Sequence, residues 1–449
     1  MTTTAALLGG MRVIEAAAFV AAPLGGMTLA QMGADVIRLD TVGGGLDYRR
    51  WPVTEDNTSL FWCGLNKCKR SVVVNLSSPE GRELAMALIT APGPEAGMLL
   101  TNFPPRGWLS YEALSERRPD LIQLTLQGDR QGGSAVDYTV NTRVGFPLLT
   151  GPEDSDEVVN HVLPAWDLVT GKMAALGLLA AERHRLRTGQ GQHVKLALED
   201  MALATMAHLG FIAESQLGQQ RKRYGNYLFG AFGRDVMCAD GVRLMVVGLT
   251  GKQWQSLVEA IGMHEEVQRI EQTQGLNLRR EGDRFKAREA IAMAVQTWVG
   301  ARTFAQVSQV FEQHGVCWGR YQSVEQMIEH TLPGNPMFST VHQPGVGAIS
   351  SPSLELDFSA MEREPARPAP VLGQCAIETA DGTEAGANAV GVVAAPTDDE
   401  FDDTNLTVEL ELVQPIAAAV GTPVLISKDG GSGASVFAAT VLATGEAPR

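Results

Sequence analysis

The hydrophobic and polar positions at the start of the chain follow two periods in turn. Residues 11–15 and 34–40 are short runs centred on Val and Ile, which predict β-strands. Residues 24–32, between them, follow Pro23 and have the apolar composition of a buried helix. A strand, a helix and a second strand within about thirty residues predict a right-handed crossover and a parallel sheet.

The same alternation continues toward the middle of the chain. Apolar runs predict further strands, and helical patterns separate them. We place strands at residues 71–76, 97–101, 121–126 and 193–198, and helices at residues 79–89, 111–117, 167–188 and 200–213. Because strands that alternate with helices are typical of α/β proteins, we predict an α/β fold with a Rossmann-like parallel sheet.

A chain of 449 residues is too long for one compact core, so more than one domain is expected. After a polar and basic stretch near residues 215–223, the helical patterns accompany few strands, which favours a smaller α+β domain. The tail turns acidic at residues 398–403 and then alternates, with a hairpin turn predicted at residues 429–433. We predict a large α/β domain over 1–215, a small α+β domain over 225–325, a return segment over 326–375 that completes the large domain, and an acidic linker with a short β-rich tail over 376–449.

One mainly apolar helix begins with an acidic residue. Pro164 can start this helix, and Ala, Leu and Met dominate its body up to Glu182. A basic end over residues 183–188 follows, with Gly189 as the predicted C-cap. Asp167 lies in its first turn, where the helix dipole favours a carboxylate. The ordinary interpretation is an N-cap, because Asp is a preferred capping residue. The alternative is a catalytic carboxylate held by a buried helix, and the helix alone does not decide between them.

Charge and cysteine content exclude several classes of function. A net charge of −15 and a pI near 5.1 argue against a nucleic-acid partner, although a local basic patch can still bind an anionic ligand. The five cysteines are scattered and odd in number, which fits reduced thiols in the cytoplasm better than a disulfide framework. Cys63 and Cys68 have no matching Cys or His pair nearby, so we expect no zinc site.

The uncharged run at residues 16–34 is long enough to suggest a membrane span. It contains Pro23, several glycines and Gln31, and charged residues lie close on both sides. The residues before it lack the basic start of a signal peptide. We therefore interpret it as a β-loop-α unit of a cytoplasmic protein that has no membrane partner.

Known catalytic motifs are absent, so the loops after strands carry the candidate chemistry. The sequence has no Walker loop, H-E-x-x-H or G-x-S-x-G motif, and its eight histidines do not cluster. We expect neither a metal nor a redox cofactor. Residues 43–45 are a glycine run that favours a flexible turn, and residues 47–51 form a plausible site rim. The basic residues within 67–70 are equally compatible with a phosphate contact and with a solvated turn.

Four stretches of the sequence follow the pattern of one known family. They are residues 22–40, residues 66–71 (an N-K-R-S-like segment with Cys68 inserted), residues 102–103 (the end of an E-N-F-like segment with Thr101 in place of Glu), and Asp167 with residues 188–194. Each stretch alone is weak evidence for the family, but the four together are specific to it. Over roughly residues 10–373 the chain resembles CoA-transferase family III, the group of formyl-CoA transferase and carnitine CoA-transferase.

The resemblance implies a reaction based on one carboxylate. Asp167 matches the family's nucleophile, which attacks a thioester carbonyl to form a mixed anhydride and then an enzyme–CoA thioester. Backbone N–H groups near a helix start or a glycine loop can stabilise the oxyanion. Val74, Asn102 and Phe103 match positions that line the CoA site, and Val20 replaces a family Gln beside the active site.

The resemblance also implies partners. Coenzyme A enters as part of an acyl-CoA substrate, so no separate cofactor is expected. On charge alone, Lys69 and Arg106 are our candidates for the CoA phosphates. The family's proteins are interlocked homodimers, and the linkers near 215–225 and 325–350 are compatible with that arrangement.

A closer likeness within the family lies in residues 19–31, 43–52 and 159–167. It is to members that move CoA between the C1 and C4 carboxyls of one mesaconate (2-methylfumarate), with no external acceptor. Such a reaction requires a cationic acyl pocket, and Tyr48, Arg49 and Arg50 are candidates for holding the free carboxylate because guanidinium pairs well with it.

Three other functions stay open from the sequence. The first is an intermolecular CoA-transferase for a dicarboxylic acid. The second is an α-methylacyl-CoA racemase, which uses a His about thirty residues before the Asp; Asp137 occupies that position here, which disfavours this reaction. The third is a non-catalytic acyl-CoA-binding protein.

Overall fold

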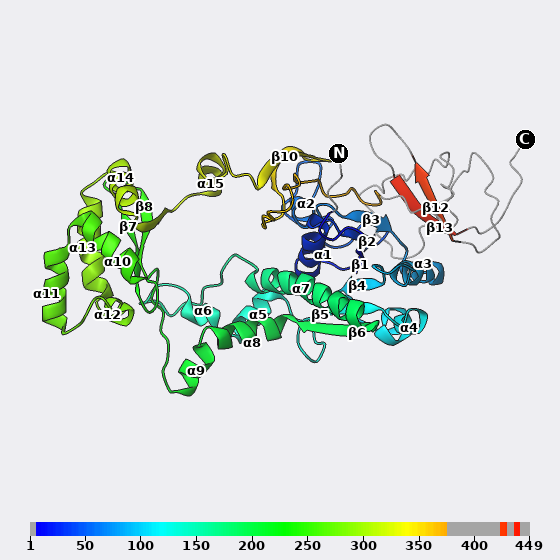
Figure 1. Ribbon diagram of the computed structural model, residues 1–449, viewed down its shortest axis with the longest axis horizontal. Coiled ribbons are helices and arrows are strands. Elements are labelled where there is room, and N and C mark those ends of the chain that lie inside the picture. Colours follow the sequence, from blue (N-terminus) through cyan, green and yellow to red (C-terminus); the bar gives the residue numbers. More distant parts are fainter. Residues whose placement is uncertain (1–5, 375–422, 429–434, 441–449) are drawn as a thin grey trace, which may run out of the picture. The chain divides into compact units, whose positions relative to one another are not determined.

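The computed structural model describes residues 6–374, 423–428 and 435–440 (Figure 1). Its described residues divide into two compact units. The first draws on Met1–Val140, Pro164–Leu203 and Pro336–Arg449, and the second on Asn141–Leu163 and Ala204–Asn335. The predicted acidic linker and hairpin turn lie outside the described residues, and the domain boundaries stay predictions.

The first unit is built on a mainly parallel sheet, as the alternating pattern predicts. Its six parallel strands are β1 (Arg12–Ala16), β2 (Asp35–Asp40), β3 (Arg70–Val73), β4 (Met98–Thr101), β5 (Ile122–Gln127) and β6 (Gln192–Ala197). Their order is β3-β2-β1-β4-β5-β6. This is the doubly wound order, in which successive strands are added on one side of β1 up to β3 and on the other side from β4 onward. The antiparallel pair β12 (Pro423–Lys428) and β13 (Ser435–Thr440) extends the sheet beside β3. The predicted α/β fold is confirmed.

The two faces of this sheet each carry a hydrophobic core. Neighbouring residues in a strand point to opposite faces, so Val13 joins one core and Ile14 the other. One core is covered by α1 (Ala21–Gln31) and α7 (Ala165–Thr188), and the other by α3 (Pro79–Ile89) and α4 (Tyr111–Arg117). The remaining elements of this unit are α2 (Leu60–Leu65), η1 (Gly107–Leu109), α5 (Asp137–Arg143), α8 (Leu198–His208), β10 (Phe338–Gln343) and β11 (Gly347–Pro352), of which α5 and α8 run on into the second unit.

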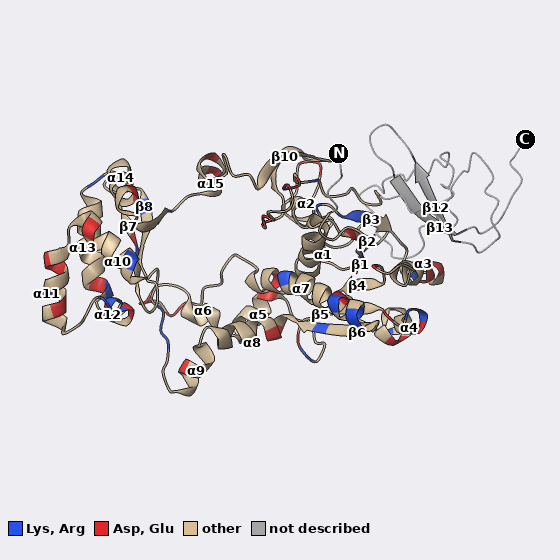
Figure 2. Cartoon of the chain, in the orientation of Figure 1, with Lys and Arg blue, Asp and Glu red and all other residues tan. Residues whose placement is uncertain are grey.

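Helix α7 stops at Thr188, after the basic end predicted from the sequence. The predicted cap, Gly189, closes it with φ 72°. Figure 2 shows basic residues along the last turns of α7. Arg185, one of them, is buried and donates hydrogen bonds to the carbonyls of Ala96 and Gly97. This tertiary contact explains why a polar stretch continues the helix.

Glycines bring α1 and α7 into close contact. A Cβ at Gly171 would lie 2.6 Å from the carbonyl oxygen of Ala21 and 2.9 Å from Cβ of Leu24. A Cβ at Gly25 would lie 3.0 Å from the Gly171 oxygen. Because the first turn of α7 precedes Gly171 by about one turn, this contact places Asp167 beside the start of α1.

We expect Gly171→Ala to destabilise the protein by about 1–3 kcal/mol, because the new methyl meets backbone atoms that cannot rotate away. The higher helix propensity of Ala offsets about 1 kcal/mol at most. Urea unfolding measures the difference. Gly177→Ala is the matched control in the same helix, since its Cβ would meet only a movable Leu124 methyl at 3.0 Å. Equal stability of the two variants would contradict a tight α1–α7 contact.

The second unit contains a three-stranded antiparallel sheet, β7 (Phe232–Met237), β8 (Arg243–Gly248) and β9 (Cys317–Arg320), in the order β7-β8-β9. A single core joins this sheet to its helices. The helices of this unit are α6 (Phe146–Leu149), α9 (Phe211–Gln216), α10 (Gly251–Ile261), α11 (His264–Gln274), α12 (Glu281–Lys286), α13 (Arg288–Gly300), α14 (Phe304–His314) and α15 (Val324–His330). The predicted α+β character of this region is confirmed. Across the described part of the chain, none of the helices combines the length and apolar composition that a membrane crossing requires.

Candidate active site

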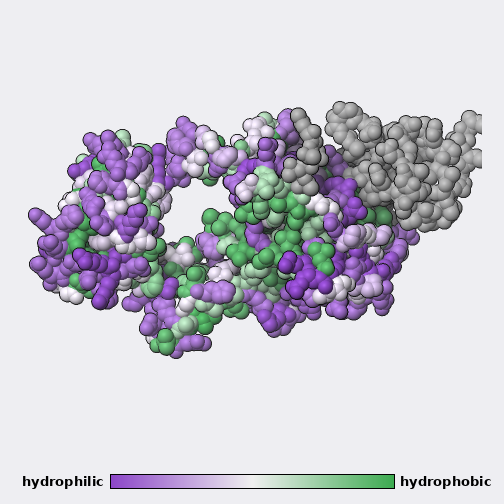
Figure 3. All heavy atoms as spheres, in the orientation of Figure 1, coloured by the Kyte–Doolittle hydropathy of each residue, from purple (hydrophilic) through white to green (hydrophobic). Residues whose placement is uncertain are grey.

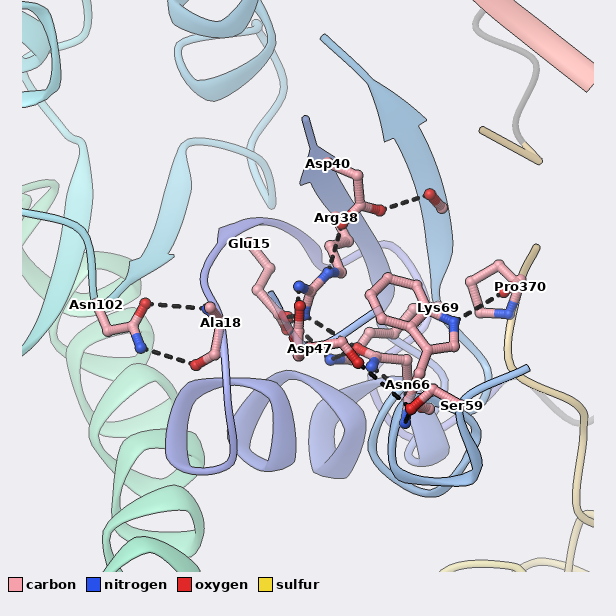
Figure 4. Close-up of polar contacts among 12 residues, drawn as sticks. Glu15, Ala18, Arg38, Asp40, Asp47, Ser59, Asn66, Lys69, Asn102 and Pro370 are labelled. Atoms are coloured by element: carbon pink, nitrogen blue, oxygen red, sulfur yellow. Dashed lines mark hydrogen bonds and ion pairs between the residues drawn. The ribbon is translucent and has the colours of Figure 1, made fainter. Parts of the chain in front are cut away.

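The carboxyl ends of β1 and β4 meet at the reversal point of the sheet, where α/β proteins bind ligands. Asn102 follows β4 and reaches the loop after β1 (Figure 4). Its Nδ2 donates to the Ala18 carbonyl at 2.8 Å, and its Oδ1 accepts from the Ala18 N–H at 3.1 Å. Asn102 therefore fixes the β1–α1 loop, whose last residue, Val20, is buried at the start of α1.

Two of the other predicted CoA-lining residues take part in the core below this loop. Phe103 is half-buried and packs against the core under α3 and α4. Val74 is 2% exposed in the same core. Phe19, in the β1–α1 loop, has φ 70°, which is rare for a residue with a side chain and concentrates at functional sites.

Asp167 is the third residue of α7 and is partly buried. Burial, the largest cause, and the neighbouring Asp137 carboxylate raise its pKa from 3.8 to about 7, while the Arg50 guanidinium acts in the opposite direction. A carboxylate with a pKa near 7 is more basic than an ordinary one. It is therefore a better nucleophile and is still ionised in about half of the molecules at neutral pH.

The cap of α7 comes from a residue that sequence reasoning missed. Asp137 accepts hydrogen bonds from the backbone N–H groups of Trp166 at 2.7 Å and Asp167 at 3.1 Å. Pro164, at the N-cap position itself, makes no side-chain cap. The ordinary interpretation of Asp167 as the N-cap is therefore wrong, and Asp137 takes that role. The only signal for Asp137 in the sequence was that it lies thirty residues before Asp167.

The loop after β2 brings one of the three predicted carboxylate-binding residues toward Asp167. Arg50 influences the pKa of Asp167, and its guanidinium lies 5.7 Å from the Phe19 ring centre and 5.1 Å from that of Phe61. Arg49 is exposed and donates to the Gly43 carbonyl at 3.5 Å. Tyr48 packs edge-on against Trp62 with 4.9 Å between ring centres, and burial raises its pKa.

A buried ion-pair cluster lies under this loop (Figure 4). Arg38 contacts Glu15, Asp40 and Asp47, and the side chain of Lys69 is fully buried against Glu15 at 2.9 Å. The burial of Lys69 contradicts our assignment of this residue to a CoA phosphate, because its ammonium group does not reach the surface. Burial lowers the pKa of Lys69 to about 8, opposed by Glu15. Arg106 is exposed after β4, and its assignment stays a prediction.

Comparison with known proteins shows the family of the chain. The model of CoA-transferase family III matches residues 8–375. A 2-methylfumaryl-CoA isomerase of Chloroflexus aurantiacus is 56% identical over 373 residues, which cover 82% of this chain and 91% of that protein. A succinate–glutarate CoA-transferase of Agrobacterium fabrum is 34% identical over 275 residues, which cover 57% of this chain and 66% of that protein. The crystal structure of a CAIB/BAIF family protein from Brucella suis has the same fold, with a TM-score of 0.67 at 24% identity over 82% of this chain and 97% of that one.

Proposed function

Because the chain belongs to CoA-transferase family III, we propose that it moves coenzyme A between the two carboxyl groups of one 2-methylfumarate (mesaconate) molecule. The observation that carries this proposal is the 56% identity to the 2-methylfumaryl-CoA isomerase over 82% of the chain. The protein is then an isomerase built on a CoA-transferase fold. Asp167, at the start of α7, is the residue through which the acyl group passes.

The reaction balances through two covalent states of Asp167. Its carboxylate attacks the C1 thioester carbonyl, the C–S bond breaks, and a mixed anhydride and CoA thiolate form. The thiolate attacks the aspartyl carbonyl and releases mesaconate, which leaves an enzyme–CoA thioester. The C4 carboxylate of the same mesaconate then attacks this thioester, the C–S bond breaks, and a second mixed anhydride and CoA thiolate form. The thiolate attacks the C4 carbonyl, and the Asp167 carboxylate leaves. Asp167 is regenerated, and neither a proton nor an external acid is consumed.

The hydrogen bonds of Asp137 restrict where the oxyanion can be stabilised. The N–H groups of Trp166 and Asp167 already donate to its carboxylate. These two donors at the helix start are therefore not free for a tetrahedral intermediate. This changes the expectation that the start of the helix itself supplies the oxyanion donors.

An incubation without any free acid tests the function. The C1 thioester of mesaconate is the only substrate, and NMR follows the position of the thioester. We expect the C4 thioester to form until the two isomers reach equilibrium. If the C4 thioester appears only after a free dicarboxylic acid is added, the protein is an intermolecular transferase.

A labelled acid sharpens this distinction. With unlabelled thioester and ¹³C-mesaconate together, an isomerase that retains its acid incorporates label far more slowly than it forms the C4 isomer. An intermolecular transferase incorporates label at the rate of turnover. This alternative is kept because the relative from Agrobacterium fabrum is named as a transferase between two acids.

We expect Arg50→Gln to lower activity most at acidic pH. Removal of the guanidinium removes the cause that lowers the pKa of Asp167, so the pKa rises above about 7 and the ionised fraction at neutral pH falls. The acidic limb of kcat/KM should move up by roughly 0.5–1 pH unit. Arg49→Gln is the matched control, because Arg49 is the next residue in the loop and its guanidinium donates to the Gly43 carbonyl. The same shift in both variants would mean that Arg50 acts only through the overall charge of the loop.

We propose further that the enzyme works as a homodimer in the cytoplasm, as the family resemblance implies. An apolar stripe on α7 supports an interface: Val169, Met173 and Leu176 are 43%, 38% and 58% exposed, and their spacing puts them on one side of the helix. Figure 3 shows apolar side chains gathered over this part of the first unit. Light scattering should give twice the chain's 48.0 kDa.

A further inference from the structure

We propose that Asp137 is a positioning residue whose charge, beyond capping α7, drives acyl transfer onto Asp167. The proposal rests on the function argued above, because it assigns Asp137 a role in forming the covalent states of Asp167. It is carried by the placement of the two carboxylates at one helix start, by their burial, and by an unsatisfied oxygen of Asp137.

The geometry of Asp137 goes beyond what a cap requires. One of its oxygens, Oδ2, accepts both N–H groups of the first turn of α7, at 2.7 and 3.1 Å. Among the described residues its other oxygen, Oδ1, is buried without a hydrogen-bond partner. The side chain as a whole is 2% exposed. A buried oxygen without a partner destabilises the folded state, so its presence in a native site calls for a functional explanation.

Capping alone does not explain a negative charge at this position. Asn and Ser cap helices about as well as Asp does, and they carry no charge. Asp137 places a second carboxylate beside the nucleophile, where two buried like charges repel. Natural sequences can avoid that repulsion at no loss of the cap, so we attribute the charge itself to the reaction.

The repulsion acts on one side of the chemical step only. The reacting form of free Asp167 is an anion and is destabilised by Asp137. In the mixed anhydride the Asp167 oxygen is acylated, and in the thioester its carbonyl carbon is bound to the CoA sulfur. The negative charge has then passed to the CoA thiolate or to the released mesaconate, so the repulsion at Asp167 itself is relieved in both states. The charge of Asp137 therefore favours both covalent states over the free enzyme, and it leaves the exchange between those two states nearly unaffected.

Few other charges bear on Asp167 from the elements around it. Helix α1, which packs against α7, contains no titratable residue between Ala21 and Gln31. Besides Asp137, the charged group that acts on the pKa of Asp167 in the described structure is Arg50, which has the opposite effect. Lys172, one turn further along α7, pairs with Glu355 at 3.0 Å. The environment of Asp167 is thus set mainly by one carboxylate and one guanidinium.

The experiment separates the cap from the charge. Asp137→Asn keeps a side-chain oxygen that can accept the two N–H groups, and it removes the charge. Asp137→Ser also removes the charge, but its side chain is one bond shorter and weakens the cap. Asp137→Ala removes both the cap and the charge. If only the cap matters, the Asn variant behaves like the wild type and the Ser and Ala variants differ. If the charge matters, all three differ from the wild type in the same direction.

The first measurement is the ionisation of Asp167 without substrate, so it does not depend on the proposed reaction. With a pKa raised from 3.8 to about 7, Asp167 makes the folded state bind more protons than the unfolded state in this range. Stability therefore falls as pH rises from about 4 to about 7, and Asp167→Asn removes that fall. The pH range over which stability falls is the stability window of Asp167. When Asp167→Asn is compared with its parent in an Asp137→Asn background, this window should end about one pH unit lower.

The second measurement is the amount of covalent enzyme. Each variant is mixed with the C1 thioester of mesaconate, quenched in acid, and weighed intact by mass spectrometry. We expect the fraction of enzyme found as anhydride or CoA thioester to fall about three- to tenfold in the Asn and Ser variants, since one pKa unit corresponds to a factor of ten.

The outcomes separate the two proposals. An unchanged stability window in both the Asn and Ser variants overturns the role of the Asp137 charge, whatever the enzyme catalyses. A shifted window with wild-type levels of covalent enzyme also overturns it, because the charge then does not affect acylation. Wild-type enzyme that never forms a covalent adduct contradicts the proposed function, while the stability window still reports on Asp137.

Discussion

Asp167→Asn is expected to lower the rate of CoA transfer by at least about 10⁴-fold, because removing a covalent nucleophile disables a whole catalytic unit. The amide cannot form the anhydride and is not ionised at any pH of interest. The variant should fold normally, since the cap of α7 is supplied by Asp137 and not by Asp167. At pH 8 it should even be more stable than the wild type, because a buried ionised carboxylate has been removed.

Glu182→Gln is the matched control for this result. It makes the same change of carboxylate to amide on the same helix, about four helical turns beyond Asp167. NMR of the thioester position measures both variants under identical conditions. An Asp167→Asn variant with more than about a tenth of wild-type activity would exclude Asp167 as nucleophile, whereas a wild-type protein without activity would favour a non-catalytic acyl-CoA-binding role.

Arg38→Met is expected to destabilise the protein by more than about 3–5 kcal/mol, and it should yield little folded protein. Arg38 donates to Asp40 at 2.8 Å, to Asp47 at 2.8 Å and to Glu15 at 3.1 Å, and its guanidinium lies 4.5 Å from the Trp62 ring centre. Without it, Lys69 alone is left to balance three buried carboxylates. The cost comes from those uncompensated charges more than from lost packing.

Arg12→Met is the control for this variant. Arg12 also pairs with an aspartate, Asp35, at 3.0 Å, but its side chain is 45% exposed. An exposed pair contributes at most about 1 kcal/mol, so this variant should remain close to wild type. Urea unfolding at neutral pH compares the two. If both variants lose only a little stability, the charge of Arg38 is not needed to compensate the buried carboxylates.

The sheet could be predicted from the sequence because its strands are short apolar runs, and such runs depend on local composition. The strand order needed the structure, since which runs become neighbours is a tertiary property. The end of α7 could also be predicted, because a basic last turn followed by Gly189 is a local signal. The burial of Arg185 against the carbonyls of Ala96 and Gly97 could not, since that contact is tertiary.

Some residues of the candidate site could likewise be predicted from the sequence, and others could not. Asp167 could be proposed as the nucleophile because a family resemblance marks its position, and that assignment stays a prediction. Lys69 was misassigned because a run of basic residues does not reveal that Glu15, 54 positions earlier, is its partner. Asp137 was passed over as the residue that disfavours a racemase, since a cap supplied by a distant residue leaves no local pattern.

The glycine contact between α1 and α7 has a consequence for how the two ends of mesaconate exchange. Asp167 precedes Gly171 by one helical turn, and Gly171 is pressed against the backbone of α1. Asp167 is therefore held on a rigid support. If Asp167 is the nucleophile that we propose, it cannot follow a departing acid, and the diacid itself has to rotate to present its second carboxylate to a stationary side chain.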